Sequence, residues 1–224
     1  MTNLVVLDEE VPADPQSQGT TEERRKRLLS RIQQLEETGL FDYVEPDYLH
    51  SSDAAPNDSA FSNGTLWGLR NQGQSGGTSG ADIDAVRAWD ITTGSTDVIV
   101  AVIDTGIRYT HQDLSAQMWQ NPGESGAFAS DGIDNDHDGY VDNVYGINAV
   151  TGSGNPMDDN GHGTHCAGTI GAAANGSGPH VGVAWNVRLM GLKFMDSGGS
   201  GFTSDAIECI NFAVDKGARV LSCS

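Results

Sequence analysis

Two segments of the chain place an acid and a histidine where acid–base chemistry needs them. In the segment VIVAVIDTG, Asp104 directly follows an apolar run, residues 98–103, that predicts a buried strand. Parallel α/β sheets hold their functional groups at the carboxyl ends of such strands. In the segment GHGTHCAGT, His162 stands between two glycines at the predicted start of a helix. The two side chains are therefore candidates for one catalytic pair.

Acting together, Asp104 and His162 could serve as an orienting acid and a general base. A helix N-terminus favours the neutral imidazole, which is the form that accepts a proton. A carboxylate bonded to the ring fixes its tautomer and stabilises the imidazolium as it forms. Taken by itself, Asp104 could instead cap the turn that follows its strand.

A zinc site is the alternative for the same histidine. His162 and His165 are three positions apart on the predicted helix, and Asp158 or Asp159 could complete a ligand set. Such a site would support metal-dependent hydrolysis. A third class of function is a calcium-binding module without catalytic activity.

An acidic segment, DGIDNDHDGYVDN, predicts a calcium site. Alternate aspartates around a sharp turn at Gly139 let several hard oxygens converge on one ion. The segment is not an EF-hand, because the twelfth position of the loop holds Tyr145 in place of glutamate. Counting Asp131, five neighbouring carboxylates would repel one another without a cation; a merely solvated acidic turn is the alternative. The expected ligands are the side chains of Asp134, Asp136, Asp138 and Asp142 and the carbonyl group of Tyr140.

The elements that would position these residues alternate strands with helices. Apolar runs predict strands at residues 98–103, within 187–194 and at 218–222, and helical periodicity predicts helices at 161–174 and 204–216. Continuous apolar strands between helices indicate the α/β class, with a parallel sheet that helices cover on both faces. The second helix should bury an apolar face made of Ala206, Ile207, Ile210, Ala213 and Val214.

The N-terminal part is organised differently. Residues 20–39 predict one amphipathic helix, which a capping box of Thr20 and Glu23 opens and Gly39 ends. A strand-like segment, residues 41–49, follows, and the composition then changes to Ser, Asn, Asp, Gly and Pro, typical of an exposed connection. We expect a small unit at residues 1–50, a linker at 51–57 and a larger domain at 58–224.

The charge balance limits the partners. The 224 residues include 12 basic and 31 acidic ones, for a formal net charge of −19, which argues against nucleic acid and membrane partners and favours bound cations. No stretch supplies the ~20 apolar residues of a membrane helix, and the first residues, MTNLVVLDEE, lack signal-peptide features. Cys166, Cys209 and Cys223 have no CxxC spacing, so we expect buried thiols, with one disulfide as the alternative.

The two catalytic motifs also carry a family resemblance. VIDTG followed by GHGTHCAGT is similar to the Asp and His signatures of the subtilases, which use a triad in the order Asp, His, Ser. The resemblance covers roughly residues 56–224. It implies a three-layer, parallel-sheet, subtilisin-like fold and serine endopeptidase activity on polypeptide substrates. It also implies a secreted protein that is a monomer when complete.

The same resemblance bears on both ends of the sequence. Residues 1–50 resemble part of an inhibitory α+β propeptide, so the protein's own propeptide is an expected partner. ARVLSCS resembles the strand that borders the substrate, and in the family the oxyanion asparagine and the GTS nucleophile helix lie beyond that strand. A GTS at residues 77–79 precedes Asp104 and reads as a loop. The resemblance therefore implies a chain truncated before its nucleophile and inactive as it stands.

Further site residues follow from the resemblance alone. A second calcium site of the family corresponds here to Asp58, Asp113 and Asn175. Two edge strands would flank an extended substrate. Their residues in this sequence are Gly198, Gly199, Ser200 and Gly201 on one side and Ser222 and Ser224 on the other.

Overall fold

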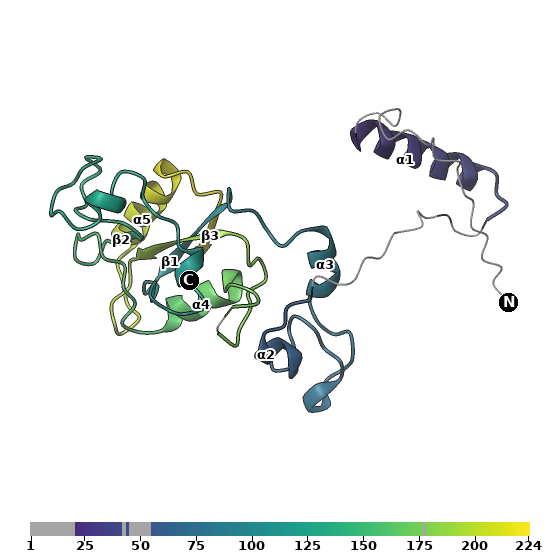
Figure 1. Ribbon diagram of the computed structural model, residues 1–224, viewed down its shortest axis with the longest axis horizontal. Coiled ribbons are helices and arrows are strands. Elements are labelled where there is room, and N and C mark those ends of the chain that lie inside the picture. The colour runs from purple at the N-terminus through teal and green to yellow at the C-terminus, as the bar shows by residue number, and fades with distance from the viewer. Residues whose placement is uncertain (1–20, 42–43, 45–54, 177) are drawn as a thin grey trace. The chain divides into compact units, whose positions relative to one another are not determined.

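The chain divides into two compact units, Met1–Ser52 and Asp53–Ser224. The computed structural model describes residues 21–41, 44, 55–176 and 178–224 (Figure 1). In the first unit, helix α1 spans Thr21–Glu37, and Gly39 has the left-handed backbone (φ 62°) common just after a helix end. The predicted helix is confirmed, whereas Thr20 and most of the strand-like segment 41–49 lie outside the described residues.

The second unit is built on a parallel sheet. Its strands in the described residues lie in the order β2-β3-β1-β4, and each neighbouring pair is parallel. Asp104 ends the central strand β1, opposite Lys193 at the end of β3. The strands are β1 (Ile99–Asp104), β2 (Gly146–Asn148), β3 (Arg188–Lys193) and β4 (Val220–Cys223). The helices are α2 (Ser59–Ser62), α3 (Ala85–Ile91), α4 (His162–Gly171) and α5 (Thr203–Asp215).

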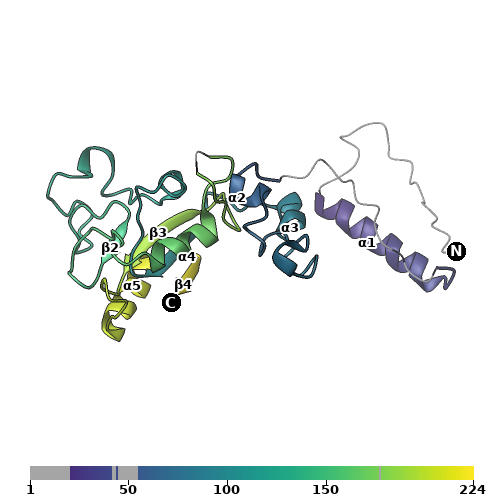
Figure 2. The same cartoon turned by 90° about the horizontal axis from the view of Figure 1, so that it is seen from below.

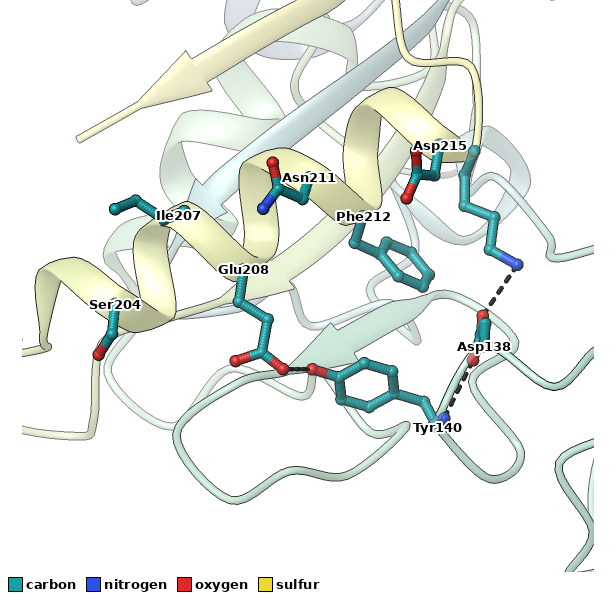
Figure 3. Close-up of a pocket in the computed structure, with 9 residues that line it drawn as sticks. Asp138, Tyr140, Ser204, Ile207, Glu208, Asn211, Phe212 and Asp215 are labelled. Atoms are coloured by element: carbon teal, nitrogen blue, oxygen red, sulfur yellow. Dashed lines mark hydrogen bonds and ion pairs between the residues drawn. The ribbon is translucent and has the colours of Figure 1, made fainter.

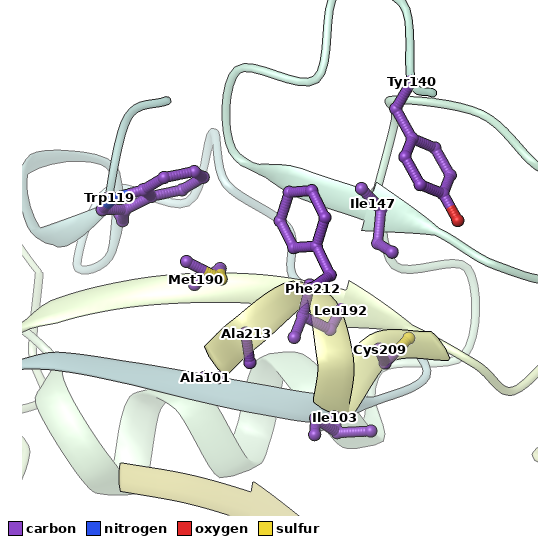
Figure 4. Packing of buried hydrophobic residues seen from close by; sticks show 10 residues of the cluster. All are labelled: Ala101, Ile103, Trp119, Tyr140, Ile147, Met190, Leu192, Cys209, Phe212 and Ala213. Carbon is purple, nitrogen blue, oxygen red and sulfur yellow. The ribbon is translucent and has the colours of Figure 1, made fainter. Parts of the chain in front are cut away.

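Helices α4 and α5 cover opposite faces of the sheet, which gives three layers (Figures 1 and 2). Successive residues of a strand point to opposite faces. Val100 and Val102 of β1 therefore join the core under α4, whereas Ala101 and Ile103 join the core under α5 (Figure 4). The predicted α/β class with a helix-covered parallel sheet is confirmed. Strand β2 was missed, because three residues carry no readable periodicity.

The buried face of α5 differs from the prediction. Cys209, Phe212 and Ala213 are buried against the sheet (Figure 4). Only Ala213 belongs to the expected face, and the helix is apolar on two sides, so periodicity could not choose between them. The prediction was wrong for three residues that remain 37% to 60% exposed, namely Ile207, Ile210 and Val214.

Glycines let α4 lie directly on the sheet. A Cβ atom on Gly171 would lie 2.9 Å from Cγ2 of Val187, and one on Gly163 would lie 2.2 Å from the carbonyl oxygen of Gly106. The helix ends three residues before its predicted end, because Ala172 leaves the helical region (φ −57°, ψ 136°). Close packing therefore fixes the helix that begins at His162.

Helices α2 and α3 belong to a separate apolar cluster of the same unit. Trp89 of α3 is 3% exposed and packs between Phe61 and Trp185, with ring centroids 5.6 Å and 4.5 Å away. Its indole nitrogen donates a 2.8 Å hydrogen bond to the carbonyl group of Val183. The cluster thus joins the segment before β1 to the segment after α4. Within the described ranges, every helix is too short or too polar to cross a bilayer.

Candidate active site

The end of β1 and the start of α4 bring Asp104 and His162 together. Nδ1 of His162 lies 2.8 Å from Oδ1 and 2.9 Å from Oδ2 of Asp104. The Asp104 side chain is fully buried, whereas the His162 side chain is 54% exposed. Among the described residues, no group hydrogen-bonds to Nε2 of His162. The carboxylate therefore holds one edge of the ring, and the other edge is free to meet a substrate or a nucleophile.

Asp104 also sets the protonation of this ring. Its hydrogen bond is the largest cause that raises the pKa of His162, and its negative charge adds to the effect, while slight desolvation acts against it. An Nδ1–H that donates to Asp104 leaves the lone pair on Nε2. Nε2 is then the atom that can accept a proton from a hydroxyl group.

Cys166 lies beside this pair but is a poor nucleophile. Its Sγ is 3.8 Å from Nδ1 of His162. Burial, followed by the negative charge of Asp104, raises the pKa of the thiol, so it stays protonated at neutral pH. The expected burial is confirmed for Cys209 alone, because Cys166 is partly buried and Cys223 is exposed.

The geometry does not favour the zinc alternative. His165 is exposed on α4, and the carboxylate of Asp158 is occupied by hydrogen bonds from backbone and hydroxyl donors. In the described parts of the chain, groups of at least three His, Cys, Asp or Glu donors within metal-binding range occur twice. They are Asp104–His162–Cys166 and Glu124–Asp134–Asp136, and neither contains His165.

The segment expected to form the first substrate-flanking strand contains a turn instead. Oδ1 of Asp196 accepts hydrogen bonds from the N–H groups of Gly198 (2.9 Å) and Ser200 (3.1 Å). Gly199 has a left-handed backbone, with φ 76°. A Cβ atom on Gly201 would lie 2.0 Å from the carbonyl oxygen of Phe194. Residues 198–201 therefore form a turn in place of the expected strand, because the Asp196 side chain closes the backbone on itself; their role in substrate binding stays a prediction.

The second expected flanking segment is a strand. Ser222 lies in β4 and pairs with Val102 of β1. The N–H group of Ser224 donates a 3.3 Å hydrogen bond to the carbonyl oxygen of Ile103. β4 is the last strand in the sheet order among the described residues, so its other edge has backbone groups that an extended peptide could meet.

The acidic loop forms a cluster that differs from the predicted one. Carboxylate oxygens of Asp134 and Asp136 lie within 4.8 Å of each other and of one from Glu124, which the sequence analysis missed. Glu124 is completely buried. Its Oε2 and the Oδ1 atom of Asp136 are buried without a hydrogen-bond partner. Unpartnered buried carboxylate oxygens are destabilising unless a cation meets them, so these three residues fit a calcium ion.

Two of the other predicted ligand groups, the carboxylates of Asp138 and Asp142, already accept hydrogen bonds from backbone N–H groups, and the Tyr140 carbonyl group stays a predicted ligand. Oδ1 of Asp138 accepts a hydrogen bond from the Tyr140 N–H group (3.0 Å), and Oδ1 of Asp142 accepts one from the Gly132 N–H group (3.2 Å). The Tyr140 hydroxyl donates to Glu208 on α5, across the pocket between the loop and this helix (Figure 3). Burial is the main cause that raises the pKa of Tyr140, and Glu208 adds to it.

A lysine balances part of the loop's negative charge. Nζ of Lys216, which follows α5, lies 2.6 Å from Oδ2 of Asp136 and 2.8 Å from Oδ2 of Asp138. Burial opposes ionisation of Asp136, but hydrogen bonds from Lys216 and Asn121 outweigh it and lower the pKa of Asp136. Lys216 therefore offsets part of the repulsion that was expected among the five aspartates.

Two of the three residues of the second expected calcium site are buried acids. Asp58 is 3% exposed and Asp113 is 4% exposed. Oδ2 of Asp58 accepts a 2.8 Å hydrogen bond from the Asn175 N–H group, and its Oδ1 atom is buried without a partner. Oδ1 of Asn175 already accepts a hydrogen bond from the Asn57 N–H group. Gly178, in the same loop, packs against the carboxylate of Asp113. The unpartnered oxygen of Asp58 fits a cation.

The fold and the site define an α/β protein with an aspartate–histidine pair at the carboxyl edge of its parallel sheet. Residues 95–224 match the subtilase family. The chain is 34% identical over 193 residues to a thermophilic serine proteinase of Bacillus sp. strain AK1, over 86% of this chain and 39% of that relative. The chain therefore belongs to the subtilase family.

Two further comparisons agree. The chain is 30% identical over 217 residues to a cell wall-associated protease of Bacillus subtilis strain 168, covering 96% of this chain and 21% of the relative. The crystal structure of the Aeromonas sobria serine protease, in complex with a chaperone, aligns with a TM-score of 0.50 and 25% identity over 69% of this chain and 23% of that one. The chain spans less than half the length of these relatives.

Proposed function

We propose that the protein is a serine endopeptidase in which Asp104 and His162 supply the acid and the base of an Asp-His-Ser triad. Membership of the subtilase family implies this class of enzyme. The observation that carries the residue assignment is the 2.8 Å contact between Nδ1 of His162 and the fully buried Asp104. Because the chain spans only part of its relatives' length, the activity is proposed for the full-length protein.

In the proposed reaction, Nε2 of His162 accepts the proton of a serine hydroxyl while that oxygen attacks the peptide carbonyl carbon. The imidazolium then gives the proton to the leaving amine, and Asp104 keeps Nδ1 protonated and stabilises the charge. Among the described residues, no serine hydroxyl bonds to Nε2. We therefore propose that these 224 residues alone have no peptidase activity, because acid and base without a nucleophile cannot form an acyl-enzyme.

Hydrolysis of a peptide substrate by variants of the full-length protein tests the pair. His162→Ala or Asp104→Asn should lower kcat by about 10⁴-fold or more, with a smaller effect on KM. His165→Ala is the matched control, because His165 is exposed on the same helix three positions away, and it should keep its activity. Turnover near the wild-type rate by His162→Ala would overturn the assignment.

We also propose that calcium is a structural cofactor. Glu124, Asp134 and Asp136 would hold one ion, and Asp58 with Asp113 would hold a second. The first site is supported by three carboxylates within 4.8 Å of one another, of which two have a buried oxygen without a donor. The second is supported by the buried, unpartnered Oδ1 atom of Asp58, and carboxylate oxygens are the ligands that calcium prefers. A bound ion would neutralise these oxygens and tie the acidic loop to the segment around Glu124.

The remaining proposals concern partners and location. Residues 1–50 would act as the protein's own inhibitory propeptide. Polypeptide substrates would bind along residues 198–201 and 222–224, and the full-length protein would be an extracellular monomer. The relative described as cell wall-associated supports the location, and the solved serine protease in complex with a chaperone supports a dedicated protein partner.

A further inference from the structure

Asp158 is an acidic residue close to the catalytic pair for which the mechanism above has no use. It lies four positions before His162, and its carboxylate accepts five hydrogen bonds. Oδ1 accepts from the Thr105 hydroxyl (2.9 Å) and from the N–H groups of Asn160 (3.0 Å) and Gly161 (2.9 Å). Oδ2 accepts from the N–H group (3.0 Å) and the hydroxyl group of Thr164.

These donors are the immediate neighbours of the pair. Thr105 follows Asp104, Gly161 precedes His162, and Thr164 lies in the first turn of α4. The Thr105 hydroxyl oxygen also accepts a 3.0 Å hydrogen bond from the N–H group of Gly163. One carboxylate and one hydroxyl therefore fasten the end of β1 to the start of α4.

This attachment of α4 to β1 is important because few contacts hold the imidazole ring of His162 itself. The His162 side chain is 54% exposed and is held through Nδ1. The aim of Nε2 therefore depends on where the backbone places the first turn of α4. A displacement of about 1 Å in a catalytic group can lower a rate by about 100-fold.

The negative charge of Asp158 also affects His162, in addition to the hydrogen bonds that hold the backbone in place. Burial opposes ionisation of Asp158, but the N–H group of Gly161 and the hydroxyl group of Thr164 lead the donors that outweigh it and lower its pKa. The ionised group also raises the pKa of His162, as a smaller cause than Asp104.

We propose that Asp158 is a positioning residue for the catalytic pair, which locks the start of α4 onto the end of β1 and so aims Nε2 of His162. This inference rests on the proposed endopeptidase function. The competing role is that of a helix cap, which would stabilise α4 without affecting the chemistry. A cap would change the melting temperature alone, whereas a positioning residue changes kcat and its pH dependence.

The test compares steady-state kinetics of the full-length protein and its variants from pH 5 to 9. Asp158→Asn keeps the size of the side chain but loses the charge and two acceptor sites. It should lower kcat about tenfold to a hundredfold, change KM far less, and move the acidic limb of kcat/KM to lower pH. Thr105→Val removes the hydroxyl bridge and should also lower kcat, and Thr105→Ser should restore most of it.

Asp159→Asn is the matched control, because it removes the same charge one position away. The Asp159 side chain is 55% exposed and pairs with Lys193 at 2.6 Å, so the loss of kcat should be clearly smaller than in Asp158→Asn. If Asp158→Asn does not fold, the comparison of Thr105→Val with Thr105→Ser still measures the effect of the hydrogen-bonded bridge on kcat. The inference would be overturned if Asp158→Asn or Thr105→Val kept the wild-type kcat and the wild-type acidic limb, and only its melting temperature fell.

His162→Ala in the same series separates this inference from the proposed function. If His162→Ala keeps its activity, the proposed triad itself is wrong. If His162→Ala is inactive while the Asp158 and Thr105 variants turn over normally, the triad stands and only the positioning role of Asp158 is refuted.

Discussion

Replacing Glu124 with glutamine tests whether the buried acidic cluster binds calcium. The variant removes one negative charge and keeps an oxygen that can accept the hydrogen bonds from the backbone N–H groups of Asn135 and Asp136. It also adds an N–H donor to the cluster that contains Asp136, whose Oδ1 atom has no partner. The substitution should therefore be harmless to the calcium-free protein and harmful to calcium binding.

The expected size of the effect follows from ligand linkage. An ion that is present at 100 times its Kd, and that binds only the folded state, adds about 2.7 kcal/mol to the free energy of unfolding. In a domain of 150 to 250 residues, 1 kcal/mol shifts Tm by roughly 2–4 °C. The ion at the Glu124 cluster should thus contribute roughly 5–11 °C to the rise in Tm that calcium causes in the wild-type protein. Glu124→Gln should lose most of this shift, and in a chelator its Tm should equal or exceed that of the wild type.

Differential scanning calorimetry measures Tm with calcium and Tm in a chelator. The full-length protein is inhibited during the measurement to prevent self-digestion. Asp142→Asn is the matched control, because Asp142 lies outside the Glu124 cluster. Its left-handed backbone (φ 52°) tolerates asparagine. This variant should keep the calcium shift. An unchanged calcium shift in Glu124→Gln, or its loss in Asp142→Asn, would refute the reasoning.

Three further predictions concern pH, the second cation and the N-terminal unit. Asp104 raises the pKa of His162 above its ordinary value of 6.5, so the acidic limb of kcat/KM should lie above pH 6.5. In the residual activity of Asp104→Asn this limb should move to lower pH, and an unmoved limb would contradict this cause. Asp58→Asn should lower the number of bound calcium ions, counted by equilibrium dialysis, from two to one; an unchanged count would remove the second site. A polypeptide of residues 1–57, added to enzyme that lacks it, should slow peptide hydrolysis reversibly; undiminished hydrolysis at high concentration would exclude an inhibitory role.

The sequence was informative where a function depends on one local segment. The apolar run before Asp104 predicted a buried central strand, and the small residues around His162 predicted a helix that packs closely on the sheet. Both elements formed within a few residues of their predicted bounds. Each motif thus carries its own geometry, so the pairing of Asp104 with His162 could be anticipated from two separate stretches.

The sequence was uninformative where tertiary packing decides. Glu124 lies ten positions before Asp134, in a stretch without alternating acids, so nothing local marks it as part of the cluster. Lys216 reaches the acidic loop from 80 residues away along the chain. On α5, two apolar sides compete, and the choice of Phe212 over Ile210 follows from the space between the sheet and the acidic loop. No periodicity contains that information.

The central claim is that His162 activates a serine in the full-length protein. Its most direct test is the rate of covalent labelling by a fluorophosphonate, which reacts with activated serine hydroxyls. We expect labelling at one serine in the wild-type protein and in His165→Ala, and a labelling rate lowered by orders of magnitude in His162→Ala. Labelling of His162→Ala at the wild-type rate, or no labelling of the wild-type protein, would contradict it.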